Sequence, residues 1–82
     1  MPHAKPDPAL AATVRRLREE RGVTRDALAF EAGIAVGSLA GIELAHSSPS
    51  WDTFKRIAAA LDLPTGQLAE AIEAETTSAR GD

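Results

Sequence analysis

Two glycines, Gly22 and Gly33, divide the first half of the chain into short segments, each with apolar residues at helical spacing. Glycine adopts positive φ without strain and is therefore a common residue just after a helix ends. Thr24 is a suitable N-terminal cap between them, which leaves room for a helix of only about eight residues. A short helix that ends at a glycine and is followed at once by another helical pattern favours an all-helical fold with tight turns.

The same periodicity continues to the end of the chain and predicts five helices and no strand. We expect them to run from Pro8 (capped by Asp7) to Gly22, from Thr24 to Gly33, from about Ala35 to Leu44, from Ser50 to Leu61, and from a Thr65 cap to residue 75. Residues 8–75 would then form one domain. The segments 1–7 and 76–82 are polar or proline-containing and are expected to be disordered tails.

The segment from Thr24 to Leu44 meets the packing requirements of a helix-turn-helix. Two helices that cross steeply need a small residue at their contact, and Ala29 provides it. Gly33 suits the turn, and Leu39 and Ile42 lie three positions apart, as needed to pack the second helix on the first. The remaining inward positions are Leu28, Ala32 and Ile34.

Charge and composition limit the functions available to the 82 residues. The net charge is −3, yet five of the nine basic residues fall within one short stretch: Arg15, Arg16, Arg18, Arg21 and Arg25. This polarity allows one basic face on an acidic protein. There is no cysteine and no apolar run long enough to span a bilayer, so we expect a cytoplasmic protein. The two histidines, His3 and His46, belong to no catalytic or metal-ligand pattern, so we expect neither an enzyme nor a cofactor or metal.

Residues Leu10 to about Ile72 resemble the Xre/Cro/C1-type helix-turn-helix domain. The residues that carry the resemblance are Leu17-Arg18-Glu19-Glu20-Arg21-Gly22-Val23-Thr24, Leu28-Ala29-Phe30-Glu31-Ala32-Gly33-Ile34, Ile42-Glu43, Pro49-Ser50 and Ile57-Ala58-Ala59-Ala60-Leu61. The resemblance implies a five-helix, lambda-repressor-like fold and a role in bacterial or phage transcription regulation through binding of double-stranded DNA as a dimer. It also implies an ion pair between Arg18 and Glu43, which would orient the third helix.

The third helix would be the recognition helix of such a domain, and its base-facing positions carry few polar groups. They are Val36, Gly37, Ser38 and Gly41, with Ala40 beside them. Of these, only the hydroxyl of Ser38 can hydrogen-bond a base edge. The predicted phosphate contacts are Arg15, Arg25, His46, Lys55 and Arg56. Arg25 matches the family position at the start of the second helix that contacts the DNA backbone.

The sequence therefore predicts a DNA-binding transcription regulator that is sequence-specific or reads DNA shape. We expect a homodimer through the fifth helix, at Leu68, Ala71 and Ile72, with Trp51 as a further candidate. The alternative for these residues is that they close the core of one subunit. The alternative function is a protein-interaction module, antitoxin-like or partner-docking, that uses the same fold with weak or no DNA binding.

Overall fold

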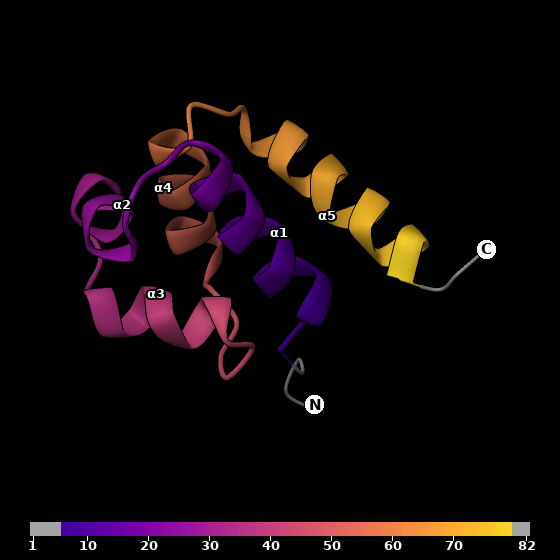
Figure 1. Ribbon diagram of the computed structural model, residues 1–82, viewed down its shortest axis with the longest axis horizontal. Coiled ribbons are helices and arrows are strands. Elements are labelled where there is room, and N and C mark those ends of the chain that lie inside the picture. Colours follow the sequence, from indigo (N-terminus) through magenta and orange to yellow (C-terminus); the bar gives the residue numbers. More distant parts are fainter. Residues whose placement is uncertain (1–5, 80–82) are drawn as a thin grey trace.

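The computed structural model describes residues 6–79, and in these residues it contains five helices and no strand. They are α1 (Pro8–Glu20), α2 (Arg25–Ala32), α3 (Val36–Glu43), α4 (Trp51–Ala60) and α5 (Thr65–Ala79). Figure 1 shows α2 and α3 joined by a tight turn at one side of the molecule, with α5 alongside α1 at the other. None of the helices in residues 6–79 is both long and apolar enough to cross a membrane.

The helix boundaries follow from local chemistry that is visible in the sequence. Asp7 Oδ1 accepts a hydrogen bond from the Ala9 amide at 2.9 Å, and Thr24 Oγ1 accepts one from the Ala27 amide at 3.0 Å. Gly22 and Gly33 follow α1 and α2 with φ of 71° and 72°, which explains why glycine stands at both positions. The predicted ends of α1 to α4 are correct to within two residues.

The prediction for α5 was wrong at both ends. Thr65 is the first helical residue rather than the cap, because the Pro64 carbonyl already accepts a hydrogen bond from the Leu68 amide at 3.2 Å. The helix continues to Ala79, so the predicted disordered tail 76–82 begins too early. The polar Thr76 and Thr77 do not oppose a helix that is already nucleated, and their hydroxyls donate to the Ile72 and Glu73 carbonyls. Residues 1–5 and 80–82, which include His3, lie outside the described part of the chain.

The core lies between all five helices and fixes the angle between α2 and α3. Its largest residues, which are at most 2% exposed, are Leu28, Leu39, Ile57, Leu61 and Leu68. Ala29, 1% exposed, lets the backbones of the two helices approach where a larger residue would hold them apart. Burial of each leucine or isoleucine contributes about 1.5–3 kcal/mol, so this small core is what holds the helix-turn-helix in place.

Two of the three predicted dimer residues of the fifth helix lie in the core of the single chain. Leu68 is fully buried and Ile72 is only 6% exposed, both within the core of the single chain, and Ala71 is half-buried. The reason is that α5 packs on α1 and α4 and closes the core with these side chains. A domain of this size has few apolar residues beyond those its own core requires. Leu68 and Ile72 therefore have little surface left for a contact with a second chain.

Candidate nucleic-acid interface

The outward face of α3 is neutral and nearly featureless. Leu39, Ile42 and Glu43 point into the protein, which leaves Val36, Gly37, Ser38, Ala40 and Gly41 on the accessible side. Val36 is 45% exposed, and Leu44, which follows the helix, is 49% exposed. Glu43 is the one charged residue of α3 and is buried, so the exposed face of the helix carries no charge.

The two glycines of α3 differ in what surrounds them. A Cβ at Gly41 would lie 3.0 Å from Ser47 Oγ, because the loop after α3 folds back onto this residue. The Gly41 carbonyl accepts hydrogen bonds from the His46 and Ser47 amides at 2.8 and 3.2 Å. A Cβ at Gly37 would meet nothing within 4 Å. The fold therefore uses the small size of Gly41, whereas at Gly37 it leaves the helix backbone open to solvent.

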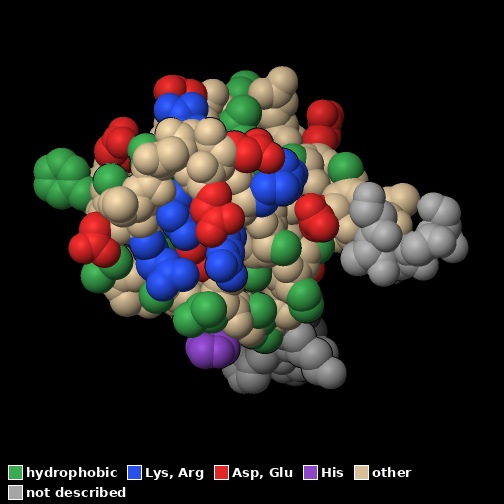
Figure 2. Space-filling model, viewed as in Figure 1, with side chains coloured by type: hydrophobic (Ala, Val, Ile, Leu, Met, Phe, Trp, Pro, Cys, Tyr) green, Lys and Arg blue, Asp and Glu red, His purple; other side chains and the backbone are tan. Residues whose placement is uncertain are grey.

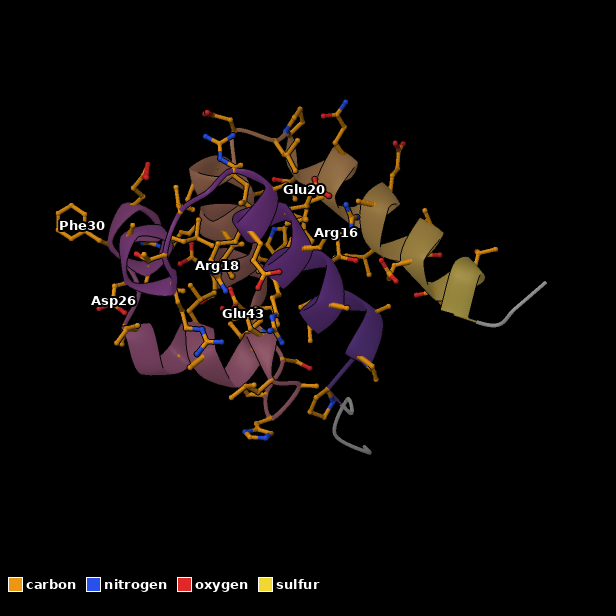
Figure 3. The ribbon with its side chains drawn as sticks, in the orientation of Figure 1. Arg16, Arg18, Glu20, Asp26, Phe30 and Glu43 are labelled. Carbon is orange, nitrogen blue, oxygen red and sulfur yellow. The ribbon has the colours of Figure 1, made fainter. Side chains whose placement is uncertain are left out.

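Behind this face, the carboxylate of Glu43 binds two arginines from other helices. Arg18, at the end of α1, donates from Nε to Oε2 at 2.7 Å and from Nη2 to Oε1 at 3.0 Å. Its Nη1 donates to the Val23 carbonyl at 2.9 Å. Arg25, the first residue of α2, donates from Nε to Glu43 Oε1 at 3.1 Å. Figure 3 shows Arg18 and Glu43 side by side between α1 and α3.

The three residues form an ion network with different degrees of exposure. The Glu43 side chain is completely buried, that of Arg18 is 11% exposed, and that of Arg25 is 33% exposed. The hydrogen bond to Glu43 raises the pKa of the Arg18 guanidinium above its ordinary value, so this arginine stays charged at every accessible pH. Two positive charges and one negative charge leave a net charge of +1, and Arg25 is the member that solvent reaches.

The other arginines of α1 lie on the same face of the molecule as this network. Arg15 pairs with Glu19 at 3.1 Å and lines an open hollow of about 420 Å³ with Glu43 and Leu44, so it lies near the end of α3. Arg16 pairs with Glu20 at 3.0 Å. Figure 2 shows basic side chains gathered above α3, with acidic side chains between them. The face is thus only mildly basic, and its least compensated positive charge is the Glu43 network.

The remaining predicted phosphate contacts are more dispersed. His46 is exposed in the loop after α3, near the Arg15 hollow. Arg56 lies over the turn between α2 and α3, since a Cβ at Gly33 would be 3.1 Å from its Nη1. Arg56 also donates to Asp52 Oδ2 at 2.8 Å, which lowers the pKa of that carboxyl. Lys55 lies elsewhere, with Nζ 5.8 Å from the centre of the Trp51 ring.

Two large aromatic residues are exposed: Trp51, a further candidate for the dimer surface in the sequence, and Phe30, whose exposure the sequence did not predict. Trp51 is 65% exposed and stacks on Phe54 at a centroid distance of 5.9 Å. The pair borders a groove of about 390 Å³, whose other lining residues are Leu10, Ser48, Pro49, Ser50 and Ala69. Phe30, in α2, is 86% exposed and points away from the body of the protein (Figure 3). Periodicity marks residues as apolar but does not show which of them the core has room for.

The contact between Arg25 and Glu43 was also missed, although a signal for it exists. Arg25 occupies the first position of α2 and Glu43 the last of α3, and a helix-turn-helix brings these two ends together. An arginine at the former position is long enough to reach the carboxylate. The predicted structural pair of Arg18 and Glu43 is present in the structure, as one half of this larger network.

An all-α domain with five helices, a steep α2–α3 turn and an exposed third helix defines the helix-turn-helix class. Comparison with known protein families agrees, since a model described as "Helix-turn-helix domain" matches residues 9–71. The chain therefore belongs to the helix-turn-helix domain family. No sequence among curated proteins matches it significantly.

Solved structures of regulators have the same fold. The restriction-modification controller protein C.AhdI from Aeromonas hydrophila is 26% identical over 74% of this chain and 92% of its own, with a TM-score of 0.72. The clp gene regulator ClgR from Corynebacterium glutamicum is 25% identical over 98% of this chain and 86% of its own, with a TM-score of 0.78.

The controller protein C.Esp1396I is 17% identical over 93% of this chain and 99% of its own, and its TM-score of 0.82 shows a shared fold. These comparisons confirm the predicted family resemblance, the lambda-repressor-like fold class and the general function, a DNA-binding helix-turn-helix regulator. The neighbours are regulators rather than enzymes.

Proposed function

We propose that the chain is a homodimeric, non-enzymatic transcription regulator that places α3 in the major groove of double-stranded DNA and holds the flanking phosphates with basic residues around it. The observation that carries the proposal is the position of the net positive charge. Arg25 lies at the start of α2, beside the exposed neutral face of α3. The amino end of a helix adds a favourable field for a phosphate at the same place.

The phosphate contacts in this proposal are Arg25, Arg15 and His46, which surround the carboxyl end of α3, and Arg56 at the α2–α3 turn. We assign Lys55 to the Trp51 groove instead, because its ammonium group lies against the ring. Arg25 and Arg56 stand near opposite ends of α2, about 12 Å apart along a helix of this length. That spacing allows contacts to separate phosphates along one DNA strand.

Base recognition in this proposal depends little on hydrogen bonds. Ser38 is the single side chain on the outward face of α3 that can donate to or accept from a base edge. Val36 and Ala40 can contact thymine methyl groups. With so few polar contacts, discrimination between sequences must come mainly from the shape and deformability of the DNA and from the spacing of two half-sites.

A second copy of the chain supplies the remaining affinity. We propose that the groove of Trp51, Phe54, Leu10 and Ala69 is the dimer surface, since it is an apolar hollow whose lining includes the exposed Trp51 and the partly buried Leu10 and Phe54 at the edge of the core. Two domains joined there would present two α3 helices to successive major grooves, about 34 Å apart. Dimerisation also doubles the number of phosphate contacts. A single domain, with one net positive charge at its site, needs these additional contacts to bind DNA tightly.

The alternative is a protein-docking role for the same surface. The observation that favours it is the neutral outward face of α3, bordered by Val36 at 45% and Leu44 at 49% exposure. A helix face without charge suits the centre of a protein interface better than the surface of DNA. In this case the arginines would stabilise the fold and would not bind phosphates.

Fluorescence anisotropy separates the two roles. The wild-type chain is titrated against its own upstream DNA and a scrambled duplex at about 50 and 200 mM salt. DNA binding predicts a steep loss of affinity with salt. It also predicts that Arg25→Ala weakens binding to both duplexes and flattens the logarithmic salt slope by about one unit. Flat titrations with both duplexes would favour the docking role.

A further inference from the structure

We infer that Glu43, although it is negatively charged and buried, promotes phosphate binding by holding the Arg25 guanidinium in its binding position. The inference rests on the proposed DNA-binding function and adds a positioning residue to it. Arg25 reaches Glu43 Oε1 through Nε, at 3.1 Å. In the part of the chain that the structure describes, its two Nη atoms donate to no protein group.

The geometry of the guanidinium explains how one arginine can serve two anions. Arginine has a planar fork with five N–H groups, so the Nε edge can face a carboxylate while the Nη groups face elsewhere. Arg25 is held at that edge by a carboxylate with no exposed surface, and it keeps 33% of its own side chain exposed. The exposed fraction is therefore a fixed donor group beside α3, not a freely rotating side chain.

Arg18 is poorly placed to bind a phosphate, because each of its three side-chain nitrogens already donates to a protein oxygen and its side chain is only 11% exposed. Its Nε and Nη2 bond Glu43, and its Nη1 bonds the Val23 carbonyl. Arg18 and Arg25 share the single negative charge of Glu43, so the network keeps one net positive charge. A single phosphate would bring the three-residue network to neutrality. Fixing the arginine in advance also lowers the conformational entropy that binding must otherwise remove.

A purely electrostatic role and a positioning role of Glu43 predict opposite changes in DNA affinity when the carboxylate is removed. If Glu43 acted only through its charge, its removal would strengthen binding to DNA, which repels carboxylates. If Glu43 positions Arg25, its removal weakens binding even though the protein gains one unit of positive charge. Glu31 provides the matched control, because it is exposed on α2 and its conversion to Gln changes the net charge by the same amount.

The experiment measures the affinity of four proteins for one duplex at two salt concentrations: wild type, Glu43→Gln, Arg25→Ala and the double variant. We expect Glu43→Gln to weaken binding about tenfold, the usual scale of a lost charge-assisted hydrogen bond. In the Arg25→Ala background the same change should have less than about a twofold effect, since the residue it positions is gone. Glu31→Gln should bind as wild type or slightly more tightly.

Arg25→Lys keeps the test decisive if Glu43→Gln does not fold. Lysine retains the charge but lacks the fork, so it cannot contact Glu43 and a phosphate with separate edges. We expect it to keep the salt slope of wild type while losing about tenfold in affinity. Tighter binding by Glu43→Gln, additive effects in the double variant, or full affinity in Arg25→Lys would each overturn the inference. If wild type binds no DNA, the proposed function itself fails.

Discussion

Arg18 and Glu43, 25 residues apart in sequence, are joined by two parallel hydrogen bonds of 2.7 and 3.0 Å. The pair connects the end of α1 to the end of α3 and so fixes α3 relative to the core. Its geometry is the bidentate one that makes arginine–carboxylate contacts strong and directional. The Glu43 side chain has no contact with solvent. Replacing either partner by a neutral residue therefore leaves the other charge without its ion pair and lowers the stability of the domain.

Arg18→Met should therefore destabilise the domain strongly. Glu43 would keep only the single hydrogen bond from Arg25, and the Val23 carbonyl would lose its donor. We expect the free energy of unfolding to fall by about 3–5 kcal/mol, as when one partner of a buried ion pair is removed. Urea unfolding followed by circular dichroism measures it. The control is Arg15→Met, whose exposed pair with Glu19 contributes about 0.5 kcal/mol or less. Equal losses in the two variants would contradict the structural role of Arg18.

Thr13 offers a substitution that should stabilise the fold. Its side chain is completely buried, and its hydroxyl oxygen has no hydrogen-bond partner among the residues described by the structure. Valine has the same shape without the buried polar group, so Thr13→Val should raise the free energy of unfolding by about 1 kcal/mol. Thr76→Val is the comparison, because the Thr76 hydroxyl already bonds the Ile72 carbonyl at 3.0 Å. A melting temperature that does not rise for Thr13→Val would show that the hydroxyl is satisfied.

The helix-turn-helix was predictable because its determinants are local. Caps such as Thr24, the glycine after each short helix and the small Ala29 all act within a few residues of sequence. The surface was less predictable, because exposure depends on what the whole fold covers. Leu68 and Trp51 have similar apolar character, yet α5 buries the former against α1 and α4 while the latter stays 65% exposed. Likewise, Arg25 is recognisable as a surface arginine, but its contact with Glu43 depends on the crossing angle of two helices.

Trp51→Ala should shift the protein from dimer to monomer. Trp51 borders the proposed dimer groove, and a large exposed aromatic residue at an interface commonly contributes 2 kcal/mol or more, about a thirtyfold change in the dissociation constant. Sedimentation velocity over a range of concentrations measures the shift. The matched control is Phe30→Ala, which removes an 86%-exposed aromatic side chain from α2, away from the groove. If Phe30→Ala dissociates the dimer and Trp51→Ala does not, the dimer surface lies on α2.

Gly37→Ala distinguishes the effect of this glycine on stability from its effect at the proposed DNA-binding surface. Glycine inside a helix costs about 1 kcal/mol relative to alanine, and a Cβ at Gly37 would meet no atom within 4 Å. The substitution should therefore raise the stability of the domain by up to about this amount. In the DNA complex, however, the added methyl group would project from the outward face of α3 towards the bases. We expect weaker DNA binding in a protein that is more stable.

The control for this experiment is Gly66→Ala, in the first turn of α5. A Cβ at Gly66 also meets nothing within 4 Å, and the residue is exposed and belongs to a different helix from the recognition surface. Both variants are compared with wild type by thermal unfolding and by anisotropy on the same duplex. Weaker binding by Gly37→Ala alone would mean that the helix backbone lies close to DNA at this point. Unchanged binding by both would mean that this part of α3 stays clear of the DNA, and the proposed docking of α3 in the major groove would have to be revised.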